Sequence, residues 1–395
     1  MRTFLALILA GLMLATPDML QACEWDYDTI AMERERFPEA HELIAGLFVR
    51  HSPAHYEWRI EDREQTPLAQ RTPADYDDIA VSYDKLGRQD EAIATIRAKM
   101  ERWPDEGRYE SHANLGTFHI HAGELEAGLE HIEKAIEINP EAHFGREIYQ
   151  KLLVEYVLMV RAGEGESTLP LRDQAVFGFE AWDQSDEDAQ GRPSYAESFS
   201  LFVLHMQGTD RADRDVELAR AVKGILGMMR FGNYDSPILL EALGDLMLAV
   251  GLGVDAKMLA SRAYLKASYE TEGDASAAYR VLAEEALEMQ RGVTLAQVEA
   301  DLKKEIAQGD AFFAEIEADQ RAWAAAGKDL DAEFAAKYYK APALDVAQAG
   351  GKPGRLSHLT ASKVVFVIPF LLIAGAMVAL LWFFHRKRRG SAVTA

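Results

Sequence analysis

Cysteine is nearly absent from this chain. Cys23 is the one thiol among 395 residues, so no intramolecular disulfide can form. A Cys-x-x-Cys-His haem attachment motif is excluded for the same reason. The folded body must therefore be held together by packing and polar contacts. Apolar residues make up 49% of the chain, which is enough for a large buried core.

Positive charge is also in short supply. The chain carries 42 Lys and Arg against 64 Asp and Glu, which gives a formal net charge of −22. A chain of this charge repels the phosphates of nucleic acids, so nucleic acid is not expected as a partner. Such acidity fits a basic or apolar protein partner better than an acidic one.

The common catalytic motifs are missing. The sequence has no Gly-x-Ser-x-Gly, no P-loop, no Gly-x-Gly-x-x-Gly and no His-Glu-x-x-His. Carboxylates are abundant, but abundance alone does not identify a catalytic pair. We therefore expect neither enzyme activity nor a cofactor.

An uninterrupted apolar run lies near the N-terminus. Phe4 to Ala15 follows the positive Arg2 and precedes the small residue Ala22, which is typical of a signal peptide over residues 1–22. Cleavage there would leave Cys23 first. The stretch before it resembles the lipobox of bacterial lipoproteins, so Cys23 is a candidate for processing or lipidation.

A second apolar run lies near the C-terminus. Val364 to Phe384 carries no charge and is long enough to cross a hydrocarbon core of ~30 Å, which predicts a transmembrane helix over residues 363–385. The basic cluster at 386–389 follows, and such clusters stay in the cytoplasm. Together the two ends predict a single-pass membrane protein with an exported, periplasmic or otherwise extracytoplasmic body and a cytoplasmic tail.

Between the two ends the sequence is helical in character. Apolar residues recur at three- and four-residue steps, and strand-like alternation is nearly absent. Ser52-Pro53 predicts the start of a helix, and Thr294 with Gln297 predicts a capping box before a long helix. We therefore predict an all-α fold.

An internal repeat stands out within this region. Thr72 to Glu106 and Glu110 to Glu141 each predict a helix–turn–helix unit with a small residue, such as Gly116, where the helices cross. A looser third unit runs from Ser236 to Ser268. The turns and ends of the first two units fall at Gly87, Pro104, Gly123 and Pro140.

These units resemble the tetratricopeptide repeat (TPR) superfamily, which implies a solenoid of helical hairpins that binds proteins. The stretch from Cys23 to Thr29 is also similar to a group of exported, membrane-anchored TPR proteins. The resulting division is a signal peptide (1–22), an N-terminal helical segment (23–71), two TPR units (72–142), a helical region (143–290) with a degenerate unit (236–268), long helices (291–340), a flexible spacer (341–362), the transmembrane helix (363–385) and the tail (386–395).

The resemblance also implies a ligand groove lined by the first helix of each unit. TPR proteins that grip C-terminal carboxylates use lysine and asparagine at two of these positions, where this chain has Asp77 and Val81, so an extended basic or apolar segment fits better. Alternatively, these residues pack against neighbouring helices of the same chain. The groove candidates are Asp77, Val81, Asp84, Lys85, Glu110, Ala113, Thr117, Ile120 and His121.

Histidines gather in the second unit. His112 and His119 share a helix face but occupy positions where TPR units place packing aromatics, so we interpret them as core or half-buried residues. His51 and His55 have a spacing of four, yet Pro53 between them starts a helix and spoils a shared metal-binding face.

One acidic loop has the spacing of an EF-hand. Counting from Asp186, oxygen ligands fall at positions one, three and five, glycine at six and glutamate at twelve. Gln190 is longer than the usual fifth ligand, and a solvated acidic turn is the alternative. The calcium candidates are Asp186, Asp188, Gln190 and Glu197.

Three functions follow from these features. The first is a non-enzymatic, membrane-anchored TPR scaffold that binds another protein outside the cytoplasm. The second is a cation-responsive module that uses the loop at 186–197. The third is an enzyme whose residues carry no known signature.

Overall fold

The computed structural model describes residues 38–140, 142–164, 169–172, 194–251, 254–288, 290 and 292–339. The chain separates into two units, Met1–Pro342 and Ala343–Ala395, and every described residue belongs to the first. In these ranges the regular structure is entirely helical, without strands, as the all-α prediction requires.

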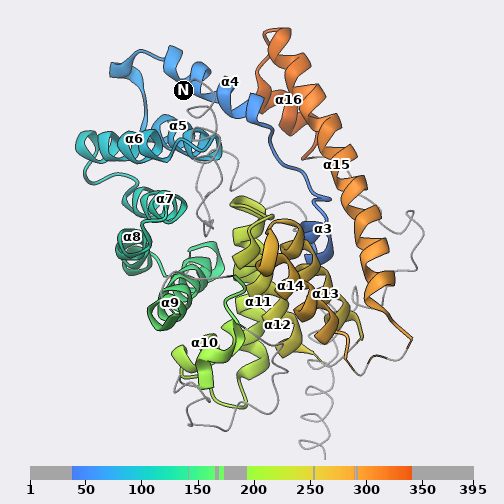
Figure 1. Ribbon diagram of the computed structural model, residues 1–395. Helices are drawn as coiled ribbons and strands as arrows, with labels where there is room; N and C mark the ends of the chain where they lie inside the picture. Colours follow the sequence, from blue (N-terminus) through green and yellow to red (C-terminus); the bar gives the residue numbers. More distant parts are fainter. Residues whose placement is uncertain are drawn as a thin grey trace, which may run out of the picture. The chain divides into compact units, whose positions relative to one another are not determined.

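The helices follow one another through the described ranges (Figure 1). Most have 13 to 19 residues, and α15 is the longest with 31. They are α3 (Ala40–Ile44), α4 (Pro53–Gln65), η1 (Leu68–Gln70), α5 (Pro73–Lys85), α6 (Gln89–Arg102), α7 (Arg108–His121), α8 (Leu125–Ile138), η2 (Ala142–Gly145), α9 (Arg146–Glu164), η4 (Ser194–Glu197), α10 (Phe199–Met206), α11 (Arg214–Phe231), α12 (Pro237–Val250), α13 (Val254–Tyr269), α14 (Gly273–Glu285), α15 (Leu295–Ala325) and α16 (Leu330–Lys337).

Local sequence signals explain where the first hairpin begins and turns. Thr72 caps α5, accepting a hydrogen bond from the amide of Asp75, and Pro73 stands at the first helical position. Gly87 has a φ of 74°, a left-handed conformation that favours glycine, and it turns the chain from α5 into α6. The helices α5 and α6 therefore form an antiparallel hairpin within the predicted first unit.

The second hairpin closes around two glycines. A Cβ atom added at Gly116 of α7 would lie 2.5 Å from Ile132 Cδ1 of α8. A Cβ atom added at Gly128 would lie 2.9 Å from the carbonyl oxygen of Gly116. The two helices therefore cross at a distance that only glycine permits, and Ile132, which is fully buried, fills the space beside them.

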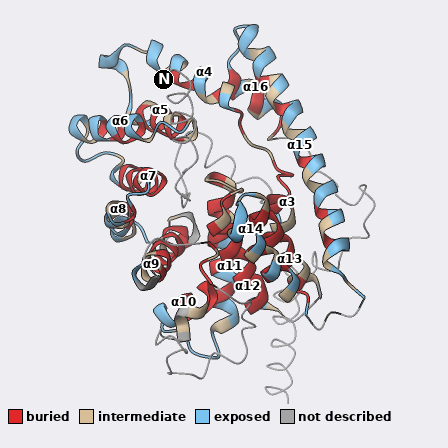
Figure 2. Ribbon diagram, in the orientation of Figure 1, coloured by how far each residue is buried: buried red, intermediate tan, exposed pale blue. Residues whose placement is uncertain are grey.

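Successive helices pack on one another from α4 to α9, and α9 then packs on α11, α11 on α12 and α12 on α13 (Figure 1). The largest apolar core runs through α9 to α14, while α5, α6 and α7 share a smaller one. From Ser111 to His121 every residue of α7 is buried, as the colouring in Figure 2 shows. This helix lies inside the stack although more than half of its residues are polar.

The long helix α15 brings the chain back to its beginning. Its capping box, in which Thr294 and Gln297 exchange hydrogen bonds with each other's backbone, confirms the predicted start. Along its length α15 packs on α13 and on α4. A Cβ atom at Gly309 would lie 2.2 Å from the carbonyl oxygen of Ala45, so α15 runs directly against the backbone after α3. The described helices thus form a stack whose last members return to its first.

The membrane-spanning part of the predicted fold needs correction. Among the described helices, none combines the length and the apolar character that crossing a bilayer requires. The transmembrane component of the fold class, and the single-pass localisation derived from it, are wrong on this finding. The residues that prompted them, 1–22 and 341–395, lie outside the described ranges, and the domain boundaries remain predictions.

We predict that Gly116→Leu destabilises the second hairpin. The added side chain has no space beside Ile132 and Gly128, and overpacking a helix crossing of this kind costs about 1–3 kcal/mol. Urea denaturation followed by circular dichroism measures the loss. Glu137→Leu, which adds the same side chain at an exposed position of α8, is the control and should leave the midpoint nearly unchanged. Equal midpoints for Gly116→Leu and the parent chain would contradict this helix crossing.

Candidate functional site

The predicted groove residues lie on α5 and α7, and most of them are buried. Val81, Ala113 and Ile120 belong to the apolar interior. Only Lys85 and Glu110 are half-exposed. The four remaining positions are buried polar residues, Asp77, Asp84, Thr117 and His121, and each has a partner on a neighbouring helix.

Asp77 of α5 is the most strongly bound of these. Both of its carboxylate oxygens accept hydrogen bonds from Lys99 Nζ of α6, at 2.8 and 2.6 Å. Asn114 Nδ2 of α7 donates to the same carboxylate at 3.3 Å. Burial raises the pKa of Asp77 to about 7, against the opposing effect of the Lys99 charge. Lys99 is completely buried. Its ion pair with Asp77, together with the bond from Asn114, therefore fixes the register of α5, α6 and α7.

Further polar pairs continue across α7. His121 Nδ1 lies 2.6 Å from Asp84 Oδ2 of α5. On the other side, Gln150 Nε2 of α9 donates to Thr117 Oγ1 at 3.2 Å. We name this set of contacts the inner polar ladder; its members are Asp77, Asp84, Lys99, Tyr109, Asn114, Thr117, His121, Glu147 and Gln150.

The last contact of the inner polar ladder joins Tyr109 of α7 to Glu147 of α9. The Tyr109 hydroxyl donates to Glu147 Oε1 at 2.8 Å, between α7 and α9. Burial, together with the Glu147 charge, raises the pKa of Tyr109 well above its ordinary value, so the phenol stays protonated and keeps donating. This hydrogen bond between α7 and α9 therefore needs no change in the protonation of Tyr109 near neutral pH.

Lys85 reaches beyond the hairpins. Its Nζ donates to the carbonyl oxygens of Phe231 at 2.5 Å and Gly232 at 2.9 Å. These carbonyls end α11, where the helix dipole is negative, so the ammonium group both caps and neutralises that end. Of the predicted groove residues, Asp84 and His121 thus contact each other, whereas Lys85 has a separate role at the end of α11.

Sequence reasoning missed the residues that bond to Asp77 and Thr117 in the inner polar ladder. Lys99, Asn114 and Gln150 carry no motif, and each is a polar residue inside an apolar helical pattern. That interruption is the signal that was available, because a buried polar side chain must find a partner. It does not say on which helix the partner lies.

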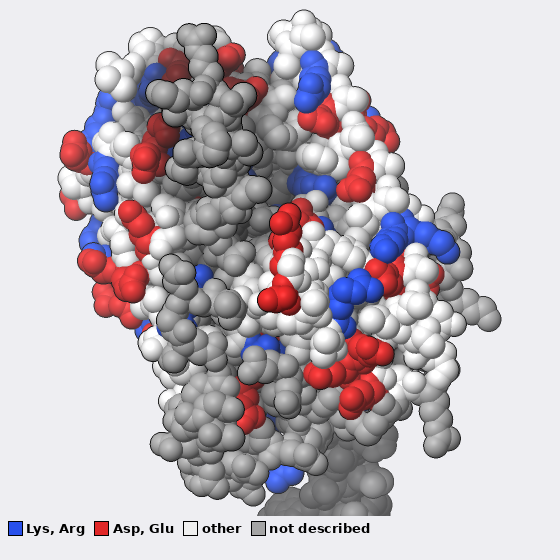
Figure 3. Space-filling view, viewed as in Figure 1, with Lys and Arg blue, Asp and Glu red and all other residues white. Residues whose placement is uncertain are grey.

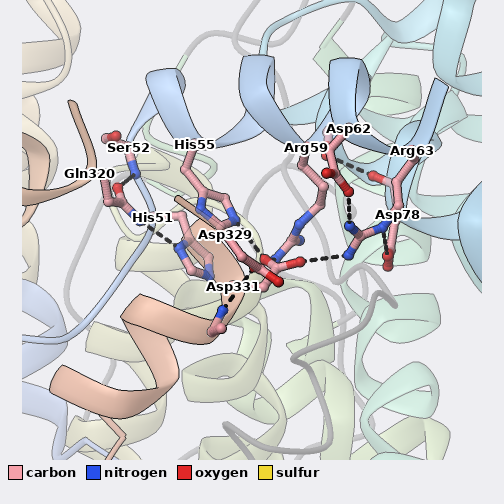
Figure 4. Close-up of polar contacts among 12 residues, drawn as sticks. His51, Ser52, His55, Arg59, Asp62, Arg63, Asp78, Gln320, Asp329 and Asp331 are labelled. Atoms are coloured by element: carbon pink, nitrogen blue, oxygen red, sulfur yellow. Dashed lines mark hydrogen bonds and ion pairs between the residues drawn. The ribbon is translucent and has the colours of Figure 1, made fainter. Parts of the chain in front are cut away.

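A second cluster joins α4 to α16 (Figure 4). Arg59 Nη2 lies 2.8 Å from Asp331 Oδ1, and Arg63 Nη2 lies 2.5 Å from Asp331 Oδ2. His55 Nε2 is 3.3 Å from the first of these oxygens. Arg63 Nε also donates to Asp78 Oδ2 of α5 at 2.9 Å. We name these five residues the Asp331 cluster.

The charges of this cluster are set by its surroundings. Burial alone would raise the pKa of Asp331, but the charge of Arg59 and the contacts within the cluster outweigh it and hold the pKa well below its usual range. Burial, with His51 and Arg59 nearby, lowers the pKa of His55 well below its ordinary value, so this ring is neutral at neutral pH. The cluster is therefore an arginine–carboxylate clamp with a neutral imidazole beside it.

Gln320 of α15 extends the clamp. Its Oε1 accepts from the amide of Ser52 at 2.9 Å, and its Nε2 lies 2.9 Å from His51 Nδ1. The rings of His51 and His55 stack with centroids 3.7 Å apart (Figure 4). The two histidines therefore lie against each other inside this clamp, and their nitrogens do not converge on a common point.

A third polar cluster is buried between α12, α13 and α14. Asp245 Oδ1 lies 2.7 Å from Arg172 Nη2 and accepts from the Tyr264 hydroxyl at 2.9 Å. One turn earlier on α12, Glu241 Oε2 accepts from the Tyr279 hydroxyl at 2.7 Å. Burial, together with the nearby Asp245 charge, raises the pKa of Glu241 to about 8. Arg172 thus pairs with Asp245, and burial holds Glu241 as the neutral acid at neutral pH.

The histidines of the second hairpin form a row at the seam of α7 and α8. His131 of α8 lies between His112 and His119 of α7, with ring centroids 5.2 and 5.6 Å away. His119 Nδ1 is held by Glu124 at 2.5 Å. Burial lowers the pKa of His112, and burial with the neighbouring rings lowers that of His131 to about 4. Of the residues described, no three His, Cys, Asp or Glu are placed to hold a metal ion together.

The calcium candidates and the processing site are almost wholly untested. Asp186, Asp188, Gln190 and Cys23 lie outside the described residues. Glu197, the last calcium candidate, is half-exposed at the end of η4. Both assignments stay predictions.

The α7–α8 hairpin is where the chain matches a known family. The family model described as tetratricopeptide repeat covers residues 109–141, nearly the whole of that hairpin. No curated protein and no solved structure matches the chain, and the likeness to an exported, membrane-anchored group gains no support. The match shows one tetratricopeptide repeat within the chain, and such repeats are protein-binding modules typical of non-enzymatic scaffolds.

We predict that Asp331→Asn weakens the fold at neutral pH by about 3–5 kcal/mol, because it leaves Arg59 buried without its counter-charge. The folded pKa of Asp331 is lowered, so its contribution is present above the unfolded pKa of about 4 and disappears as the pH falls below it. Urea denaturation at pH 7 and pH 3 should show a large and then a shrinking difference from the parent chain. Glu333→Gln on the same helix, at a half-exposed ion pair with Lys328, should have little effect.

We predict that Glu241→Gln changes the pH dependence of stability. The folded pKa of Glu241 is raised, so its contribution is complete below about pH 4.5 and is lost as the pH rises to about 8. The glutamine cannot ionise, so between pH 5.5 and pH 8.5 the variant should gain on the parent by about 3 kcal/mol, in addition to any pH-independent difference between the two proteins. Denaturation at pH 5.5 and 8.5 measures this change, with the exposed Glu284→Gln as control. If the stability difference between Glu241→Gln and the parent chain is the same at both pH values, the assignment of a neutral Glu241 is wrong.

Proposed function

We propose that this chain is a non-enzymatic helical scaffold that binds a protein through the half-exposed residues of its first helices, α5 and α7. The observation that carries the proposal is the family match over the α7–α8 hairpin, beside which α5–α6 packs as a second hairpin. Consecutive hairpins of this kind place their first helices next to each other, which gives an extended surface for a peptide segment.

The inner polar ladder supports this role by holding the surface in shape. Its hydrogen bonds and ion pairs fix α5, α7 and α9 relative to one another, so little ordering remains to be done when a ligand binds. The ladder residues themselves are buried and occupied with each other. A ligand would therefore contact the half-exposed residues beside them, of which Glu110 was predicted from sequence.

The charge of the chain favours a basic or apolar ligand segment over an acidic one. On the face shown in Figure 3, however, described acidic and basic side chains are interspersed. Selectivity would then come from single carboxylates such as Glu110 and not from one large acidic patch.

The polar clusters favour binding over catalysis. The Asp331 cluster and the Glu241–Asp245 cluster are buried between helices, and their charged groups pair mainly with each other. Such pairs specify helix register, and they do not converge on a cleft in the way that the groups of an active site do.

The test compares one substitution on the two helices of the TPR hairpin. Peptides that bind the full chain are first selected from a displayed random library. Fluorescence anisotropy then measures their affinity for the parent chain, for Glu110→Lys on α7 and for Glu137→Lys on α8. We expect basic or apolar peptides to be selected, Glu110→Lys to weaken them about tenfold, and Glu137→Lys to leave the affinity unchanged. Equal loss in both variants, or selection of acidic peptides, would overturn the proposed surface.

A further inference from the structure

Two histidine nitrogens face each other across the TPR hairpin. His112 Nδ1 on α7 and His131 Nδ1 on α8 lie 2.9 Å apart, and the rings are tilted by 31°. A hydrogen bond between two imidazole nitrogens requires that at least one of them carries no proton and offers its lone pair. The contact therefore already places an unprotonated nitrogen, which can act as a metal ligand, next to a second imidazole nitrogen at the seam of α7 and α8.

The position of the pair gives it access to solvent. His112 is 7% exposed, whereas His131 is half-buried on the outer half of the hairpin. Glu130 and Lys134 form a solvent-exposed ion pair on α8, and both charges act on the two rings. An ion could reach the two nitrogens from this side without opening the apolar core.

We infer that His112 and His131 form a two-imidazole chelating site for a divalent transition-metal ion such as Zn²⁺, Ni²⁺ or Cu²⁺. Imidazole nitrogens bind such ions at about 2.0–2.1 Å, so two of them in square or tetrahedral arrangement lie roughly 2.9–3.3 Å apart. The observed separation falls at the lower end of this range. Oxygen-preferring ions such as Ca²⁺ and Mg²⁺ are excluded by the same chemistry.

Binding needs a change of tautomer and a rotation of the two rings. The imidazole that donates its Nδ1 proton in the hydrogen bond passes that proton through solvent to its own Nε2. Rotation of the rings then turns both Nδ1 lone pairs from each other toward the ion, and no net proton is released. His119, bonded to Glu124, stays outside the ligand set, so water completes the coordination and the ion remains exchangeable.

The consequence for the protein is a bridge between the two helices of its TPR hairpin. An ion that binds the folded hairpin but not the unfolded chain stabilises it in proportion to the logarithm of its concentration. The ion would thus rigidify the hairpin on the seam side, while the inner polar ladder does so on the side of α5 and α9.

The experiment uses the full chain with Cys23→Ser, which removes its only thiol, and Zn²⁺ or Ni²⁺ as the probe. Calorimetric titration should show one ion per chain. His112→Gln and His131→Gln should each weaken it by at least about tenfold. His205→Gln, which alters a histidine stacked on Tyr195 in another part of the chain, is the matched control and should bind as the parent does.

A second measurement is independent of the variants. Nitrogen-15 spectra of the histidine rings in the parent chain should show the Nδ1 resonances of His112 and His131 shifting on addition of Zn²⁺, with both protons on Nε2. Circular dichroism checks that the glutamine variants are folded. Unchanged affinity in both variants, or Nδ1 resonances that do not respond to the ion, would overturn the site.

Discussion

A stack of helical hairpins is open at both ends, and here the ends are joined through one carboxylate. Asp331 of α16 is buried against Arg59 and Arg63 of α4, across a separation of about 270 residues. The pairing restrains α15 as well, because Gln320 and Gly309 make close contact with the backbone just before α4 and after α3. The helices between these points are thereby held from both sides, and their separate packing contacts become one cooperative unit.

The same device recurs inside the stack. Lys99 with Asp77, His121 with Asp84 and Arg172 with Asp245 each place a charged or polar pair between helices that are otherwise joined by apolar packing. Burying such groups is unfavourable unless the partner is in place, so a slipped register costs more than lost apolar contact. The helices joined in this way gain a single preferred alignment.

The hairpins could be predicted because their signals are local. Gly87 and Gly123 at the turns, Gly116 at the crossing and the Thr294 capping box act within a few residues, and the structure places helices accordingly. The polar clusters could not, because Gln320 and Asp331 meet residues more than 260 positions away. The spacing of apolar residues shows that one face of a helix is buried, but it does not show which other helix covers that face. The transmembrane prediction failed differently, since it rested on an apolar run and no described helix meets the requirement.

These constraints also limit how a ligand can be recognised. In the proposed binding surface the strongest polar groups, Asp77, Asp84 and His121, are already committed to neighbouring helices. Exchanging those bonds for contacts with a peptide would leave partners such as Lys99 buried and unpaired, which is costly. Recognition would then depend on half-exposed side chains and on the fixed spacing of α5 and α7. Contacts of that kind give modest affinity, with selectivity set by charge and shape. The affinity rises more readily when further hairpins contribute contacts than when any single contact is strengthened.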